Sequence, residues 1–316
     1  MFRILHKTSW DFLSRWKAAI FTIVFFVIPA TVLVPLKGFN YSIEFTGGTQ
    51  MDVEFVEAPE ISAVRAALAA SGHADAEIFT FGSPREISIR AQEAEQVEQL
   101  ATGASSISHQ IEETLKTAFG ADAFTVTSTA AVGPRVGSEL RQRATIATLL
   151  AFVLTLIYIA FRFEWRFGVA AVIATMHDLV AALAFMMYMN IEVSVFVVGA
   201  VLTVIGYSTN DTVVVFDRVR ENLRSNRKEK FWDLLNRSVN ETLPRTIMTG
   251  STTLTSLLAL LIFGGTVIRP FAWVLIFGIL VGTFSSVFVA SPVLYWIEKR
   301  YPRENKAAPK RQAVRA

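Results

Sequence analysis

The chain has 316 residues, of which 52% are hydrophobic, and its mean hydropathy is +0.43, so the composition excludes an ordinary soluble domain. It contains no cysteine, which excludes disulfides and thiolate metal sites, and its four histidines lack the spacing of metal ligands. The formal net charge of +3 is small, so the position of the charges along the chain is more informative than their sum.

The chain begins with a basic and aromatic segment, residues 1–17, which is followed by an apolar run over 18–36. The segment 1–17 has the composition of an amphipathic helix that lies on a membrane surface. The apolar run is long enough to span a bilayer and lacks a small-residue cleavage site. We therefore interpret it as an uncleaved first transmembrane helix.

Residues 37–140 have the pattern of a soluble α+β domain rather than of a membrane segment. Residues 41–45 (YSIEF) and 51–56 (MDVEFV) alternate between apolar and polar side chains, which predicts two strands joined by a turn at Thr46–Thr49. Two predicted helices and three further strands then follow, in an order that favours a ferredoxin-like fold. The helices are expected over 59–70 and 93–119, and the strands at AEIFTF, EISIRA and AFTVTST, the first two joined around Gly82.

Five more apolar runs follow, each long enough to cross a bilayer as a helix. Together with the first run, they predict an α-helical integral membrane protein with six transmembrane helices, five of them in a bundle over 141–297. Gly278 and Gly282 in the last run form a GxxxG pattern, which allows close packing of helices. The five runs lie near 144–161, 168–190, 193–216, 246–263 and 270–297.

Lysine and arginine gather on one side of these spans. The segment 1–17, the predicted loop 217–245 and the tail 298–316 are basic, whereas residues 37–140 are acidic and poor in lysine and arginine. The positive-inside rule then places both termini and the loop in the cytoplasm, and the α+β domain on the outer side.

Three charged residues lie in or at the edge of the apolar spans, although a charge at the bilayer centre costs at least about 2.5–3.5 kcal/mol. Asp178 follows His177 in the third span, and Arg245 begins the fifth span. Asp211 lies in the fourth span, about 10 Å from its cytoplasmic boundary. Polar residues at helical spacing extend the faces of Asp211 and Arg245 into stripes. Thr203, Tyr207 and Ser208 accompany Asp211, with Asn210 and Thr212 beside it in the sequence, and Thr249, Thr252, Thr253 and Ser256 accompany Arg245.

Two explanations fit these stripes. In the first, Asp211 and Arg245 form a fixed interhelical ion pair, or Arg245 extends to the membrane boundary. In the second, Asp211 takes up and releases a proton as Arg245 approaches and retreats, because an arginine charge favours the ionised carboxylate and desolvation disfavours it. The pair His177 and Asp178 is a second candidate for titration or for a satisfied buried contact.

Several long motifs resemble the SecD/SecF family of bacterial protein-export membrane proteins, which are related to the resistance-nodulation-division transporters. They are GYSTNDTVVVFDRVREN at 206–222, SVNETLPRTIMT at 238–249 and VGPRVGSELR at 132–141. The resemblance is to the SecF members and covers nearly the whole chain. The motif around Asn210 and Asp211 is the most specific part.

The resemblance implies a subunit of the bacterial inner membrane that works with SecD beside the SecYEG channel, often with YajC. Such a pair uses the proton gradient to pull or release an unfolded polypeptide after SecA has pushed it into the channel. Asp211 and Arg245 then carry the proton relay, and the domain 37–140 is periplasmic. The family motif after the first span corresponds to Glu44, Phe45, Gly47 and Gly48, although Ser42 and Glu44 replace the usual glycine and aspartate.

Alternatives to a proton-coupled export subunit are a scaffold that stabilises SecD and the channel, and a small-molecule efflux component. A single small outer domain leaves no room for an efflux porter region, but the scaffold uses the same residues as the motor. We expect no enzymatic activity and no cofactor. The coupling ion stays open between H⁺ and Na⁺, because Asn and Thr oxygens near a carboxylate also suit a hard cation.

Overall fold

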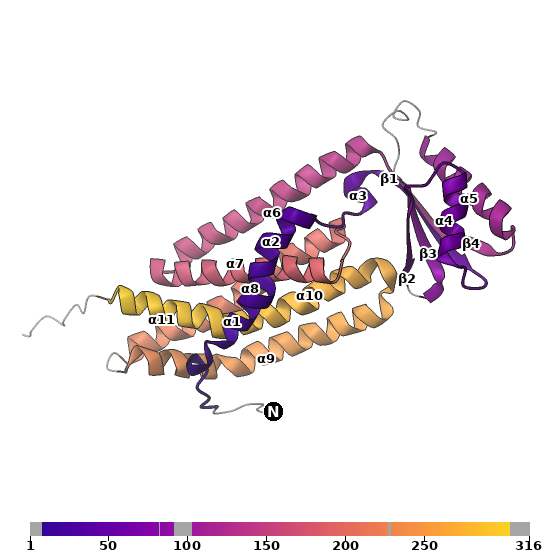
Figure 1. Cartoon of the computed structure of the whole chain (residues 1–316). Coiled ribbons are helices and arrows are strands. Elements are labelled where there is room, and N and C mark those ends of the chain that lie inside the picture. Colours follow the sequence, from indigo (N-terminus) through magenta and orange to yellow (C-terminus); the bar gives the residue numbers. More distant parts are fainter. Residues whose placement is uncertain (1–7, 82, 92–102, 227–228, 304–316) are drawn as a thin grey trace, which may run out of the picture.

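The computed structural model describes residues 8–81, 83–91, 103–226 and 229–303. A bundle of long helices forms most of the molecule, and a small sheet domain lies at one end of it (Figure 1). Within these described residues, six helical segments are long and apolar enough to cross a membrane, as the sequence predicted. They are Leu13–Lys37, Pro134–Arg162, Trp165–Tyr188, Val195–Ser225, Phe231–Phe263 and Val267–Arg300.

The N-terminal segment differs from the predicted surface helix. Residues 8–12 are not helical, and a 3₁₀ turn at Leu13–Arg15 begins the first span. The backbone N–H of Trp10 donates to Asn240 Oδ1 at 2.9 Å, and that of Phe12 donates to Asn236 Oδ1 at 2.8 Å. The asparagines satisfy backbone groups that a surface helix would have satisfied internally, so this segment is held against the bundle. Residues 1–7 of the expected helix lie outside the described residues.

The first span is a single irregular helix. It runs through α1 (Ala18–Thr22), a π-helical turn (Ile23–Val27) and α2 (Ile28–Lys37), and Gly38 ends it with a φ of +69°. The short helix α3 (Ile43–Thr46) follows after an extended segment.

The sheet domain has the strand–helix–strand–strand–helix–strand order of a ferredoxin-like fold. All three neighbouring strand pairs are antiparallel, and the spatial order is β2-β3-β1-β4. One face of the sheet packs against both helices through a continuous apolar core that includes Val53, Leu68, Ile89 and Ile111. The elements are β1 (Gly48–Phe55), α4 (Ile61–Ala70), β2 (Glu77–Phe81), β3 (Ser83–Ala91), α5 (Gly103–Phe119) and β4 (Phe124–Val132).

One predicted strand of this domain was wrong. Residues 41–45 do not form a strand beside β1; Ile43–Thr46 is the helix α3, and Tyr41 makes an isolated parallel bridge to Val193. Alternation misled the prediction because Ile43 and Phe45 are both buried without pairing beside β1, and Phe45 packs in an apolar cluster with Val193 and Val197 instead. Part of the second predicted helix, 93–102, and Gly82 lie outside the described residues.

The remaining spans are α6 (Pro134–Arg162), α7 (Trp165–Tyr188), α8 (Val195–Ser225), α9 (Phe231–Phe263), and α10 (Gly265–Ser285), which continues through a π-helical turn into α11 (Ser291–Arg300). Helix α10 packs against α7, α8 and α9, so it lies at the centre of the bundle (Figure 1). Its GxxxG pattern explains this position. A Cβ at Gly278 would clash with the Val204 side chain, and one at Gly282 would lie 3.0 Å from Ser208 Cβ, so the two glycines favour the close approach of α10 to α8.

The segment 217–245, expected to be a loop, is helical over most of its length, because α8 continues to Ser225 and α9 starts at Phe231. Polar contacts hold the two extensions together outside the apolar runs. Arg218 Nε donates to Glu241 Oε2 at 2.7 Å, and Asn222 Nδ2 donates to Ser238 Oγ at 2.9 Å. These cross-helix contacts, which hydropathy does not report, extend both spans beyond the membrane boundary. Of the predicted tail, residues 304–316 lie outside the described residues.

Candidate functional site

Asp211 is buried between α8 and α10. Its side chain is 2% exposed, and Oδ2 accepts a hydrogen bond from the hydroxyl of Thr283 at 3.1 Å. Thr283 follows Gly282, whose missing side chain brings α10 close to α8. The GxxxG packing and the position of the carboxylate are therefore one structural feature. Sequence reasoning missed Thr283, although a hydroxyl beside a GxxxG pattern was an available signal.

Arg245 is exposed on α9, and no hydrogen bond or ion pair joins it to Asp211 among the described residues. The guanidinium is near enough to interact electrostatically with the carboxylate. The structure thus brings the two predicted relay groups within range of each other without contact.

Three buried hydroxyls surround the same region. The hydroxyl groups of Tyr207, Thr212 and Thr246 are buried, and none has a hydrogen-bond partner within the described parts of the chain. Tyr207 Oη would lie 3.8 Å from a Cβ at Gly250, so the small residue of α9 leaves it room. A polar interior with free donors therefore lies close to Asp211 on α8 and α9. Thr246 was not a sequence candidate; its polar character inside a buried helix face was the signal.

The predicted polar stripes do not all face inward. Ser208 and Asp211 are buried, whereas Thr203 and Asn210 are exposed. Thr203 is eight residues from Asp211, which turns it about 80° around an ideal helix, far enough to leave the buried face. On α9, Thr249 and Thr252 are also exposed, and their hydroxyls donate to carbonyls of their own helix. The structure thus separates an inner polar site from an outer polar stripe.

A second buried polar cluster joins three spans. His177 Nδ1 lies 2.8 Å from Asp178 Oδ1, and its Nε2 lies 2.9 Å from Thr22 Oγ1 of α1. The hydroxyl of Ser208 donates to the other oxygen of Asp178. Asp178 is 1% exposed and His177 6%, so both are removed from lipid and water. The candidate pair of the sequence analysis is therefore hydrogen-bonded on both residues, and it ties α1 and α8 to α7.

We expect Asp178→Ala to destabilise the bundle by about 1–3 kcal/mol for each buried partner that it leaves unpaired. His177 Nδ1 and the Ser208 hydroxyl would both lose their contact. Thermal unfolding of the purified protein measures the effect. Asp217→Ala is the matched control, because Asp217 is 43% exposed and forms a surface ion pair with Arg162, which contributes at most about 1 kcal/mol. Equal melting temperatures for the two variants would contradict a structural role for this cluster.

The glycine motif after the first span forms a tight backbone junction. A Cβ at Gly47 would lie 2.6 Å from Pro134 Cα, and a Cβ at Gly137 would lie 2.7 Å from Gly47 N. Gly47 also has a φ of +77°, which residues other than glycine rarely adopt. Gly47 and Gly137 therefore allow the chain just before β1 to cross the start of α6 at backbone contact.

Glu44 and Phe45 of the same motif connect the sheet domain to α8. The backbone N–H of Val195, the first residue of α8, donates to Glu44 Oε2 at 2.7 Å, so Glu44 caps the helix that carries Asp211. Phe45 is 2% exposed and lies in an apolar cluster with Val193 and Val197. Ser42 and Glu44 stand where the family motif usually has glycine and aspartate. The side chain of Glu44, longer than that of aspartate, reaches the N-terminus of α8.

An ion pair reinforces this connection. Arg90 of β3 is 4% exposed, and its guanidinium contacts Glu192 in the α7–α8 link and the carbonyl of Tyr41. Burial raises the pKa of Glu192, with the charges of Glu44 and Asp52 adding to the increase and Arg90 opposing it. The sheet domain is therefore attached to the bundle at the start of α8 as well as at the start of α6. Within the described residues, no group of three or more His, Cys, Asp or Glu is arranged to hold a metal ion.

Comparison with known proteins identifies the family. The model described as protein export membrane protein SecD/SecF, C-terminal, matches residues 110–300, and the SecD/SecF GG motif matches residues 32–58. The protein translocase subunit SecF of Gemmatimonas aurantiaca is 51% identical, with 100% of this chain and 95% of that protein covered. The subunit of the same name from Desulfurispirillum indicum is 44% identical over 86% of both chains.

A solved structure agrees with the sequence relatives. The crystal structure of SecDF, a translocon-associated membrane protein from Thermus thermophilus, matches with a TM-score of 0.82 and 35% identity. The match covers 95% of this chain and 40% of that one. A SecDF structure in a super-membrane-facing form matches with a TM-score of 0.67. This multi-pass membrane protein therefore belongs to the SecD/SecF family of protein export membrane proteins, as one of its SecF members.

Proposed function

We propose that this chain couples an ion gradient to late steps of polypeptide export, as the SecF partner of a separate SecD in the bacterial inner membrane. The observation that carries the proposal is that one helix, α8, contains the buried carboxylate of Asp211 and is capped at its N-terminus by Glu44. Sixteen residues separate Val195 from Asp211, or about 24 Å along the helix. A change of charge at Asp211 thus acts on the element that holds the sheet domain.

The mechanism begins with protonation of Asp211. An ionised carboxylate in this buried position depends on Thr283 and on the field of Arg245, whereas a neutral one does not. Protonation therefore changes the force between α8 and its neighbours α9 and α10. The resulting movement of α8 passes through its Glu44 cap to α3 and β1. One charge crossing a potential of 100 mV releases about 2.3 kcal/mol, enough to bias such a movement.

The outer polar stripe supports a SecD partner. Thr203, Asn210, Thr249 and Thr252 are exposed within helices that cross the membrane, together with the charged Arg245. Polar side chains are unfavourable neighbours for lipid, and other helices cover them in membrane proteins. We propose that SecD covers this stripe and completes the relay with its own residues. The SecDF chain, of which this chain matches 40%, supports an arrangement with a second half.

The charge distribution supports the orientation. Both termini and the α8–α9 hairpin are cytoplasmic in our proposal, and the sheet domain is periplasmic, where it meets the unfolded chain that leaves SecYEG. SecA acts earlier on the cytoplasmic side, and YajC accompanies the complex. The basic residues near 1–17, in the α8–α9 hairpin and in α11 support this orientation through the positive-inside rule.

Inverted membrane vesicles that contain SecYEG and SecD, with or without this chain, test the proposal. After SecA has started translocation and ATP has been removed, a proton gradient is imposed and the completed fraction of a preprotein is measured. We expect the gradient to increase completion only when this chain is present, and a protonophore to abolish the increase. An increase with a sodium gradient alone would mean that the coupling ion is Na⁺ instead of H⁺. A requirement for the chain without any response to either gradient would favour the scaffold.

A further inference from the structure

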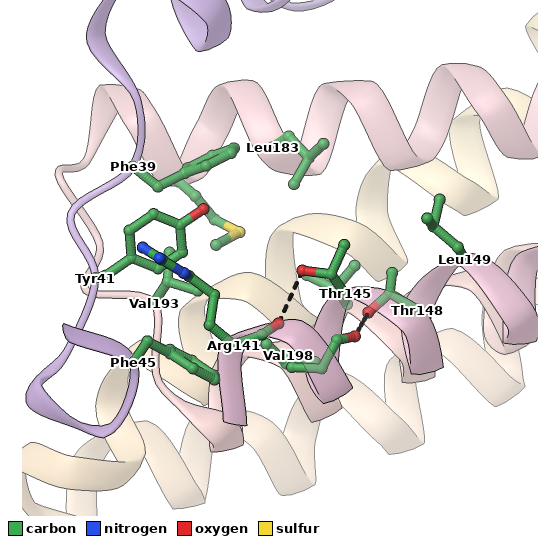
Figure 2. Close-up of a pocket in the computed structure, with 13 residues that line it drawn as sticks. Phe39, Tyr41, Phe45, Arg141, Thr145, Thr148, Leu149, Leu183, Val193 and Val198 are labelled. Carbon is green, nitrogen blue, oxygen red and sulfur yellow. Dashed lines mark hydrogen bonds between the residues drawn. The ribbon is translucent and has the colours of Figure 1, made fainter. Parts of the chain in front are cut away.

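A cavity of about 280 Å³ lies where the sheet domain joins the bundle (Figure 2). Its wall combines the segment before α3 with the first turns of α6, the end of α7 and the start of α8. Phe39, Tyr41 and Phe45 contribute aromatic rings, and Leu149, Leu183 and Val198 contribute aliphatic side chains. Its volume exceeds that of an apolar protein cavity of about 150 Å³, which stays dry and binds benzene.

The hydroxyl groups of the two threonines in the wall are already satisfied. Thr145 donates to the carbonyl of Arg141 and Thr148 to that of Ala144, each at 2.9 Å, as the dashed lines in Figure 2 show. The wall therefore offers an occupant apolar contact rather than hydrogen bonds. A hydrocarbon group fits this chemistry.

Arg141 supplies a charge at the edge of this apolar space. Its guanidinium carbon lies 5.8 Å from the centre of the Tyr41 ring, and the side chain extends toward that ring in Figure 2. Among the described residues it forms no ion pair, whereas Arg143, two residues later, pairs with Glu139. A stacked guanidinium without a carboxylate partner is suited to an anionic group from another molecule.

The position of α6 indicates where that molecule comes from. Beyond Arg141 this helix exposes a long apolar surface, which includes Ile146, Leu150 and Val153. The apolar run begins at about residue 144, so Arg141 lies roughly 4.5 Å beyond it, at the level of lipid headgroups. Thr145 and Leu149 both line the cavity and are exposed, so the cavity opens along this lipid-facing helix.

We propose that this cavity binds one acyl chain of a membrane phospholipid, with the lipid phosphate held by Arg141. The bound lipid would contact Tyr41 and Phe45, which lie in the segment between the first span and the sheet domain. Its occupancy would then stabilise the junction that Glu44 and Gly47 form. The proposal depends on the membrane location of the chain and not on gradient coupling.

Binding is tested with the full-length protein in detergent, titrated with phosphatidylglycerol that carries a diazirine on one acyl chain. Native mass spectrometry measures the affinity, and photolabelling locates the lipid. We expect labels on residues of the cavity wall. Arg141→Gln should weaken binding about tenfold through loss of a charge-assisted contact, and Arg143→Gln less than twofold.

A second pair of variants tests the cavity itself. Thr148→Trp would fill it from α6, and Thr155→Trp places the same side chain two turns further along α6, outside the wall. We expect only Thr148→Trp to abolish labelling of the wall, with circular dichroism unchanged in both. Equal affinity of the Arg141 and Arg143 variants would overturn the proposal. Labelling of the wall by a photoreactive apolar export substrate, with no displacement by phosphatidylglycerol, would also overturn it.

Discussion

Asp211→Asn is expected to abolish the gradient-dependent part of export while the chain still assembles with SecD. Asparagine has nearly the same shape and can accept the hydrogen bond from Thr283, so the packing of α8 against α10 survives. It cannot gain or lose a proton near neutral pH, so the change of charge that drives α8 is lost. The completed fraction in the vesicle assay should then be the same with and without a gradient. Co-purification with SecD measures the assembly.

Asp217→Asn is the matched control on the same helix. Asp217 lies six residues further along α8 and is exposed, with an ion pair to Arg162 at 3.0 Å. Surface ion pairs contribute little to stability, and this one lies outside the buried site, so gradient-dependent export should be retained. Normal export with Asp211→Asn would contradict the relay. Thr283→Val separates the hydrogen bond from the charge: we expect reduced export rather than complete loss.

Gly47→Ala is expected to disrupt the junction between the sheet domain and α6. Residue 47 has a φ of +77° and a ψ of 169°, a conformation that costs a non-glycine residue about 1–3 kcal/mol. The new Cβ would also lie within 2.9 Å of two backbone atoms of Pro134, which cannot move aside as a side chain can. We therefore expect faster hydrogen exchange in β1 and β4, and protease cleavage between α3 and β1.

Gly38→Ala controls for the conformational part of this effect. Gly38 has a similar φ of +69°, but a Cβ there meets no atom within 4 Å. Gly38→Ala should therefore show only the cost of the strained backbone conformation, and the rates of hydrogen exchange in β1 should stay native. Equal effects of the two variants would mean that the close approach to Pro134 contributes nothing. Gly137→Ala tests the same junction from α6, since its Cβ would meet Gly47 N.

The local pattern of the sequence predicted much of the fold. Apolar runs identified six spans, and the helix and strand signals identified a ferredoxin-like domain. The candidate residues Asp178 and Asp211 were recognisable because a carboxylate within an apolar run needs a partner. Glu44 was recognisable only through the resemblance of its motif to the family. The GxxxG pattern indicated close packing, which Gly278 and Gly282 provide.

What each group contacts was decided only by the tertiary structure. Thr283 rather than Arg245 bonds Asp211, and Ser208 belongs to the Asp178 cluster. Residues 41–45 form a bridge and part of a short helix because of partners that are distant in the sequence. Tyr41 pairs with Val193, and Glu44 accepts a hydrogen bond from the first residue of α8. Apolar composition alone identified the segments that are long enough to cross a membrane, since burial in lipid depends on the composition of each segment. The partners of the polar groups depend on how helices rotate and pack against one another, which no single segment encodes.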